Sequence, residues 1–218
     1  LFLTEAHNKN VKILKPVIHW LREHLHIVRP DSLYSSLALR AYKDKDFITY
    51  LSKFLKIADT GINEIKCETE EFDPNKHLSG FPEDLRMKVN EDLNAAHPQQ
   101  ILIHTPNESI TISKEDPEGK TPTRFLRLKT EHVRADGKST LFNVHEESDG
   151  TKRLMHLVPM LMDIWQRDRV FVIDELDRSL HTHLSRLFIK SCLAGVAEKN
   201  ARGQFIMTTH DTNLLDRT

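Results

Sequence analysis

Apolar residues in the N-terminal part of the chain recur at the three- and four-residue spacing of amphipathic helices. Pro16 suits the first position of a helix. The apolar series that follows it predicts a first helix and consists of Val17, Trp20, Leu21, Leu25 and Val28. A second helix is expected from Asp44 to Ala58, with Gly61 placed to end it. Proline and acidic residues open a third, more polar helix between Pro82 and Ala95.

From Gln99 onward the pattern changes to short β-prone runs separated by Pro, Asn, Asp and Gly. The predicted strands include 101–104, 109–112 and 125–128. Residues 124–133 and 139–144 flank Ala135-Asp136-Gly137-Lys138, in which Asp-Gly is a strong hairpin signal. We therefore expect a mainly helical lobe over residues 1–98 and an α/β region over residues 99–218.

Two apolar runs in the C-terminal part end in polar residues that can do chemistry. Residues 170–173 lead into Asp174 and Glu175, and residues 204–208 lead into Thr209-His210. If the runs are neighbouring strands, these side chains meet at one sheet edge. Asp174 then suits Mg²⁺, which takes one or two carboxylates. Glu175 can orient or deprotonate a water, and His210 can donate a hydrogen bond to a γ-phosphate oxygen.

Glu147-Ser148-Asp149-Gly150-Thr151-Lys152-Arg153 precedes a strongly apolar helix face. The face comprises Leu154, Leu157, Val158, Leu161, Ile164 and Trp165. Gly150 leaves room for a phosphate near the exposed amides, and Ser148 adds a donor. The alternative is an ordinary helix capped by Ser148 or Asp149.

Structural alternatives stay open for the other candidates as well. Asp174 and Glu175 could be surface carboxylates after a buried strand, and His210 could cap a strand. Gly137-Lys138-Ser139-Thr140 spells the end of a phosphate-binding P-loop. However, His132 stands where the first glycine belongs, and the residues that follow are strand-like. A solvated β-turn is the preferred interpretation of this segment.

These motifs resemble a known family. From about Arg124 to the end, the chain resembles the C-terminal half of an ABC-type ATPase domain. The segments 147–153 and 174–181 look like those of prokaryotic AAA-family ATPases similar to overcoming-lysogenization-defect and abortive-infection proteins. The resemblance implies an α/β, P-loop NTPase-like fold in which the N-terminal helices form an inserted lobe.

The resemblance also implies roles for individual residues. Ser148 and Gly150 would belong to the signature loop, which contacts the γ-phosphate bound by the opposite subunit. Asp174 and Glu175 would be the Walker B pair, and His210 the switch histidine. Asp177 and Ser179 would bind the nucleotide, with residues 179–181 at the D-loop position. Asp149 occupies a place that transporter ATPases give to glycine, which disfavours a transporter subunit.

Composition narrows the picture further. The net charge of −1 marks neither a nucleic-acid binder nor a membrane binder, and no apolar run is long enough to span a bilayer. No signal peptide is evident, so a cytoplasmic location is expected. Cys67 and Cys192 indicate no disulfide framework. The pairs His24/His26 and His181/His183 lack a third ligand at zinc-site spacing.

The function that these features favour is ATP binding and Mg²⁺-dependent hydrolysis by a head-to-tail homodimer. The chain resembles a fragment whose P-loop lies upstream, so the isolated segment is expected to bind ATP poorly. One alternative is a nonenzymatic module that regulates a nuclease or toxin partner. Another is a machine that grips nucleic acid. Basic residues that could contact nucleic acid, but that more simply solvate helices, are Arg22, Arg29, Arg40, Lys43 and Lys45.

Overall fold

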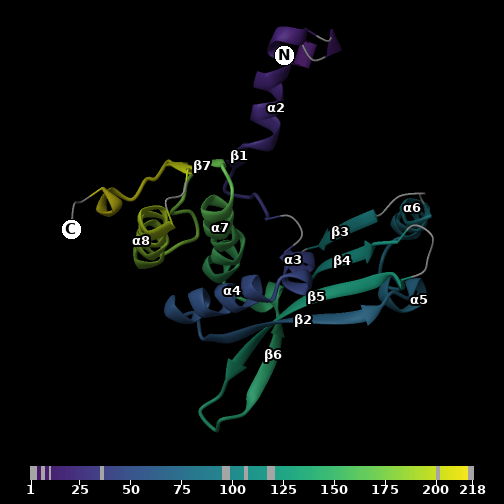
Figure 1. Ribbon diagram of the computed structural model, residues 1–218. Coiled ribbons are helices and arrows are strands. Elements are labelled where there is room, and N and C mark those ends of the chain that lie inside the picture. Colours follow the sequence, from purple (N-terminus) through teal and green to yellow (C-terminus); the bar gives the residue numbers. More distant parts are fainter. Residues whose placement is uncertain are drawn as a thin grey trace. The chain divides into compact units, whose positions relative to one another are not determined.

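The computed structural model describes residues 4–5, 8–9, 11–34, 37–94, 99–105, 108–116, 121–199 and 202–215 (Figure 1). The chain divides into two compact units. Leu1–Leu33 and His156–Thr218 form the parallel-sheet unit, and Tyr34–Met155 form the antiparallel-sheet unit. The expected boundary after residue 98 falls inside the second unit. The strands between Gln99 and Asn143 therefore belong with the helices that precede them.

The parallel-sheet unit is built on three short strands. Its elements are η1 (Lys12–Leu14), α2 (Lys15–Glu23), β1 (Leu25–Val28), the larger part of α7 (Asp149–Gln166), β7 (Val170–Ile173), α8 (Thr182–Lys199), β8 (Gln204–Met207) and η3 (Thr212–Leu214). The strand order is β1-β7-β8, and both pairings are parallel. The strand that ends at the two carboxylates is thus the central one.

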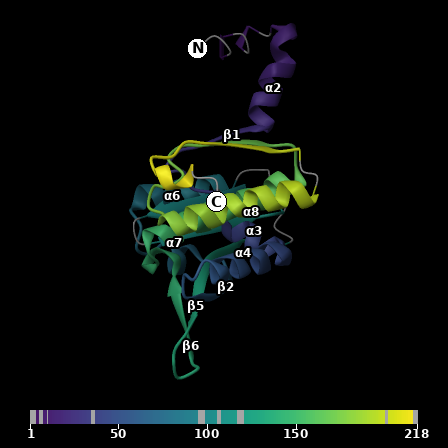
Figure 2. The same cartoon turned by 90° about the vertical axis from the view of Figure 1, so that its left-hand side faces the viewer.

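Aromatic rings line one face of this sheet. His26, Phe171 and Phe205 stack across the three strands, with ring centroids 5.1 and 5.5 Å apart. Phe188 of α8 meets Phe205 edge to face at 5.9 Å. Figure 2 shows α8 on this side of the strands. The opposite face is open within the described residues, because Ile27 and Ile206 are 66% and 53% exposed.

Helix α8 packs against α7 through a glycine. Gly195 is buried, and a Cβ added to it would lie only 1.8 Å from Nε1 of Trp165. Helix α7 is buried on almost all of its sides, which explains why apolar residues occur around the whole helix and not on one face alone. Its buried Asp163 pairs with Arg169 at 2.7 Å, so the charge that α7 carries inward is compensated.

The antiparallel-sheet unit holds five strands and four helices among its described residues. The strands are β2 (Ile62–Glu71), β3 (Gln99–Thr105), β4 (Glu108–Lys114), β5 (Arg124–Val133) and β6 (Ser139–Asn143). The helices are α3 (Leu37–Lys43), α4 (Lys45–Ile57), α5 (Pro74–His77) and α6 (Glu83–Leu93), and the short η2 (Val144–Glu146) follows β6. The order β2-β5-β4-β3 is antiparallel throughout, and β6 pairs with β5.

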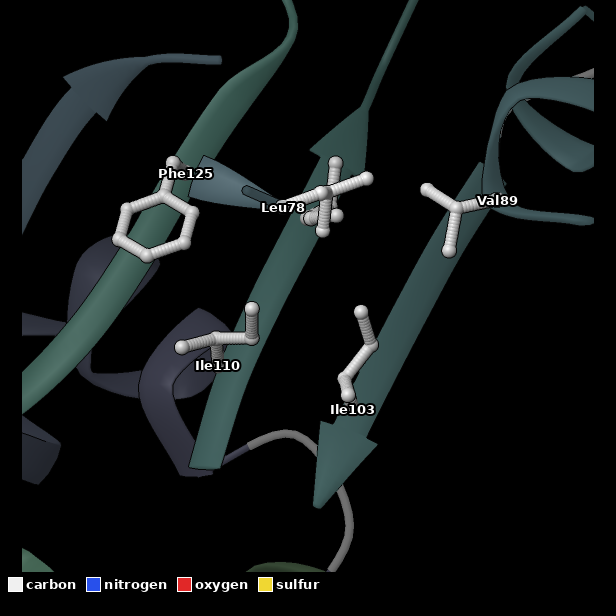
Figure 3. Close-up of a cluster of buried hydrophobic side chains, with 6 residues drawn as sticks. Leu78, Val89, Ile103, Ile110 and Phe125 are labelled. Atoms are coloured by element: carbon white, nitrogen blue, oxygen red, sulfur yellow. The ribbon is translucent and has the colours of Figure 1, made fainter. Parts of the chain in front are cut away.

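This sheet buries side chains on both faces. Figure 3 shows one cluster, in which side chains of β3, β4 and β5 meet those of α6 and of the residue after α5. Its buried members are Leu78, Val89, Ile103, Ile110, Ile112 and Phe125. Neighbouring residues alternate to the other face, where Thr111 and Leu126 are also buried. Phe47, Leu51 and Leu55 of α4 are fully buried, and α4 packs on β2.

Most predicted elements are confirmed. The helices expected from Asp44 and from Pro82 are α4 and α6, although the predicted end of the latter at Ala95 lies outside the described residues. The three β-prone runs and the hairpin are also present. The helix predicted through Val28 is wrong at its end, because α2 stops at Glu23 and Leu25–Val28 pair with β7 as a strand. Strand β2 was not predicted.

The Gly195 contact generates a stability prediction. Replacement by Ala would add about 1 kcal/mol of helix propensity, but its Cβ would displace the Trp165 indole. Overpacking of a core costs about 1–3 kcal/mol, so we expect Gly195→Ala to lower the free energy of unfolding, measured by urea denaturation. Gly80→Ala is the matched control, because nothing lies within 4 Å of its added Cβ. A stabilised Gly195→Ala protein would contradict this packing.

Candidate functional site

Asp174 lies directly after the central strand of the parallel sheet. Its backbone N–H donates to the carbonyl of Val28 at 2.9 Å, which continues the β7–β1 pairing by one step. Its carboxylate Oδ1 accepts a hydrogen bond from the Thr208 hydroxyl at 2.8 Å. The residue is exposed, whereas the preceding Ile173 is fully buried. The carboxylate therefore stands where the buried strand gives way to solvent.

Glu175 has an unusual backbone conformation. Its φ of 46° lies in the left-handed region, which costs a non-glycine residue on the order of 1–3 kcal/mol. Its N–H donates to the Thr208 hydroxyl at 2.8 Å, and its carbonyl accepts from the Arg178 N–H at 3.0 Å. Such strain persists only where surrounding contacts enforce it, and it clusters at functional sites. Glu175 is thus held by a specific turn.

The Glu175 carboxylate faces two basic side chains. Arg178 donates to Oε2 at 3.3 Å, and Nε2 of His210 lies 3.6 Å from Oε1. The Glu175 side chain is 35% exposed and the His210 side chain is 80% exposed. Solvent and a ligand can therefore reach the pair, while the contacts restrict where the carboxylate points.

The turn after Glu175 is tied to the segment after β8. Asp177 Oδ1 accepts from the His210 N–H at 3.1 Å, and the Thr182 hydroxyl donates to the Asp211 carboxylate. Burial would raise the pKa of Asp177, but hydrogen bonds from Thr209 and from backbone amides lower it on balance. The bond from Thr182 lowers the pKa of Asp211. Both carboxylates stay ionised and hold the two segments together.

The structure brings five of the seven predicted site residues into the parallel-sheet unit. Asp174, Glu175 and Asp177 follow β7, and Ser179, with a φ of 64°, completes the same turn. His210 follows β8, which pairs with β7 as expected. Asp211 caps the short helix η3 by accepting from the Asn213 N–H.

Ser148 and Gly150 lie in the antiparallel-sheet unit, at the start of α7. The Ser148 hydroxyl accepts from the Thr151 N–H at 3.1 Å, which confirms the capped helix. The Asp149 carboxylate pairs with Lys152 at 2.8 Å, and this contact lowers the pKa of Asp149. The lysine charge that opposes the helix dipole is thereby offset within the first turn.

The sequence did not predict that Thr208 would contact Asp174 and Glu175, or that Glu147 would contact Thr130 and His132. Glu147 Oε1 accepts a hydrogen bond from the Thr130 hydroxyl and lies 2.7 Å from Nε2 of His132. His132 and Glu147 line an open pocket of about 480 Å³ beside the β5–β6 hairpin. Neither residue has a local sequence signal, because the contacts join positions 15 and 17 residues apart.

Lys138 belongs to a β-turn, which confirms the β-turn interpretation of this segment over the P-loop interpretation. Gly137 has a φ of 79°, and the Lys138 N–H donates to Asp136 Oδ1 at 3.0 Å. The residues after Lys138 form strand β6, whereas a P-loop would lead into a helix. The exposed lysine therefore has no phosphate cradle around it.

The residues at the end of β7 fit a magnesium ion that arrives with a nucleotide. In the described part of the chain, no group of three or more His, Cys, Asp or Glu residues could hold a metal by itself. Mg²⁺ needs no such cage, since it keeps waters and shares phosphate oxygens with one or two carboxylates. Asp174 engages only Oδ1 with Thr208, so Oδ2 accepts no hydrogen bond within the described residues.

The pairs His24/His26 and His181/His183 make contacts with neighbouring protein groups. His26 stacks on Phe171, and burial lowers its pKa, while His24 bonds the carbonyl of Asp168. The backbone N–H of His183 donates to Nδ1 of His181 at 3.3 Å.

Over the described residues, no helix has both the length and the apolar character needed to cross a membrane.

A parallel sheet with helices packed on it and carboxylates after its central strand belongs to a mixed α/β fold that is consistent with the P-loop NTPase-like AAA type. The comparison with protein families agrees. The family described as "AAA domain, putative AbiEii toxin, Type IV TA system" matches residues 3–216, and the chain belongs to this family. No curated protein matches the chain.

The turn at Lys138 yields a prediction that separates it from a P-loop. We expect Lys138→Ala to leave nucleotide affinity unchanged and to shift the free energy of unfolding by less than about 0.5 kcal/mol, as exposed substitutions usually do. Nucleotide titration and urea denaturation of the full-length protein measure the two effects. Asp136→Ala, which removes the side-chain bond within the turn, is the comparison variant. A large loss of affinity with an intact fold would restore the P-loop interpretation.

Proposed function

We propose that this domain binds and hydrolyses ATP within a nucleotide-dependent dimer. Membership in an AAA family implies nucleotide binding and ATPase-like activity in general. The finer assignment rests on one observation above all. Glu175 is held in a left-handed turn after the central strand, with its carboxylate 3.6 Å from His210, and Asp174 precedes it. A candidate magnesium ligand (Asp174), a candidate base (Glu175) and a hydrogen-bond donor (His210) therefore lie at the same edge of the sheet.

The residues would share the work as follows. Asp174 would hold the magnesium ion, which when bound neutralises charge on the phosphates. Glu175 accepts a proton from the attacking water, or orders that water, at its carboxylate. His210 donates a hydrogen bond to a terminal phosphate oxygen, which can reach its 80% exposed side chain. Asp177 and Ser179 shape the turn that presents these groups.

The remaining contacts with phosphate are proposed to come from elsewhere. The sequence contains no complete Gly-x4-Gly-Lys-Ser/Thr motif, so the phosphate cradle is assigned to a segment outside these 218 residues. Ser148 and Gly150, at the start of an 18-residue helix, are proposed to contact the γ-phosphate held by the second subunit. Two copies would then complete two sites.

The biological setting follows from the family description, which names a putative toxin of a type IV toxin–antitoxin system. We propose that hydrolysis drives a defence-related or nucleic-acid-linked effector. A regulatory module without catalysis is the competing function. It would keep the fold and use the edge after β7 for binding only. The variant described next distinguishes the two.

Glu175→Gln in the full-length protein is expected to preserve ATP binding and to slow hydrolysis by about a hundred- to ten-thousand-fold, because it keeps shape but removes the base. Phosphate release and nucleotide binding are measured side by side. Glu64→Gln is the matched control, since Glu64 is an exposed glutamate on β2. Turnover that is the same in Glu175→Gln as in the control would exclude the catalytic role of Glu175, and the absence of turnover in the wild type and both variants would favour the regulatory module.

ATP is expected to promote dimerisation of the full-length Glu175→Gln protein, measured by light scattering with Mg²⁺ present. Gly150→Asp in this background should abolish the response by placing bulk and negative charge against the phosphate. An aspartate in the first turn is compatible with the helix dipole, so folding should survive. Gly150→Ala, which adds no charge, is the matched control. An unchanged dimer in Gly150→Asp, with ATP binding retained, would leave this segment as an ordinary capped helix.

A further inference from the structure

Thr208, the first residue after β8, makes hydrogen bonds to four consecutive residues of the candidate site. Its N–H donates to the carbonyl of Ile173 at 3.0 Å, and its carbonyl accepts from the N–H of Leu176 at 2.9 Å. Its hydroxyl accepts from the Glu175 N–H and donates to Asp174 Oδ1, both at 2.8 Å. One residue thus contacts the whole segment that carries both carboxylates.

The two kinds of bond have different consequences. The backbone bonds of Thr208 extend the pairing of β8 with β7, and any residue except proline can make them at this position. The hydroxyl bonds depend on the side chain. They reach the two groups that the strand pairing leaves unconstrained, namely the carboxylate of Asp174 and the N–H of the left-handed Glu175.

A single hydroxyl can serve both groups because it has one proton and two lone pairs. By donating to Asp174 it fixes which carboxylate oxygen is occupied and leaves Oδ2 directed elsewhere. By accepting from Glu175 it satisfies an amide that the left-handed turn removes from the sheet ladder. Both bonds are made by one atom, so the Asp174 carboxylate and the Glu175 backbone are held in a fixed mutual arrangement.

We propose that Thr208 is a positioning residue of the ATPase site, whose hydroxyl aligns Asp174 and Glu175 for magnesium binding and water activation. The proposal rests on the function proposed above. Thr208 itself touches neither substrate nor magnesium in this assignment. It acts through the Asp174 carboxylate and the Glu175 backbone, by holding them before ATP arrives.

Thr208→Val removes the hydroxyl and keeps the β-branched shape and the backbone bonds. We expect kcat of the full-length protein to fall by about 10- to 100-fold, because small misplacements of reacting groups cost rates of this order. The Kd for ATP should change by less than about twofold, because most phosphate contacts lie elsewhere in the proposed site. Thr208→Ser retains the hydroxyl and should restore most of kcat.

Thr212→Val is the matched control. Thr212 is exposed in η3, and its hydroxyl makes no hydrogen bond within the described residues, so this substitution should leave kcat unchanged. A second measurement needs no ATP. Hydrogen exchange at the Glu175 amide should accelerate in Thr208→Val but not in Thr208→Ser, because only the valine removes the acceptor.

The outcomes separate this inference from the function on which it rests. If Glu175→Gln abolishes hydrolysis while Thr208→Val hydrolyses ATP as the wild type does, the positioning role is overturned and the ATPase function stands. If folded Thr208→Ser is as slow as Thr208→Val, the hydroxyl is not responsible and the inference also fails. If Glu175→Gln hydrolyses ATP normally, the catalytic assignment of Glu175 fails, and the positioning role fails with it; if the wild type does not hydrolyse ATP, the proposed function fails.

Discussion

The parallel pairing of β7 with β1 and β8 is the constraint on which the candidate site depends. Buried Phe171 and Ile173 fix the register of the central strand, and its ladder ends with the bond from the Asp174 N–H to Val28. Ile173 is fully buried whereas Asp174 is exposed, so polar side chains reach solvent at the carboxyl end of the central strand. Asp174 and Glu175 occupy this point because the ladder stops there.

The turn that follows combines apolar and polar anchors. Leu176 and Leu180 are buried, 1% and 8% exposed, and pull the two ends of the turn onto the unit. Glu175, directly before Leu176, and Ser179, directly before Leu180, adopt left-handed conformations, which burial alone would not enforce. The bond that the Thr208 hydroxyl accepts from the Glu175 N–H and the bond that Asp177 accepts from the His210 N–H supply that constraint. Contacts with the segment after β8 thus maintain the strained turn. The same segment carries His210, so the turn with Glu175 and the segment with His210 are held together by hydrogen bonds.

Elements with a strong local pattern could be predicted from the sequence, and elements defined by distant partners could not. Helix α4 has its apolar period, its Asp44 cap and a clear end, so its bounds follow from local rules. Leu25 and Val28 also fit a helical period, but their pairing with residues 170 and 173 makes them a strand. Strand β2 is charged, and its buried Ile62 and Ile65 are three apart, because a register shift lies between Ile62 and Glu64. No local alternation marks it.

The same distinction applies to the site. Asp174, Glu175 and His210 stand out because each follows an apolar run, and the pairing of β7 with β8 confirms that the runs are neighbours. The Thr208 hydroxyl and the Asp177 carboxylate act across 33 or 34 positions, so nothing near them in the sequence indicates their partners. At Ser148 the structure confirms the helix cap that was the alternative to a phosphate-binding role. A cap also fixes the direction of the first amides of α7. Capping and phosphate contact are therefore compatible, since an anion bound at a helix start needs amides that are already ordered.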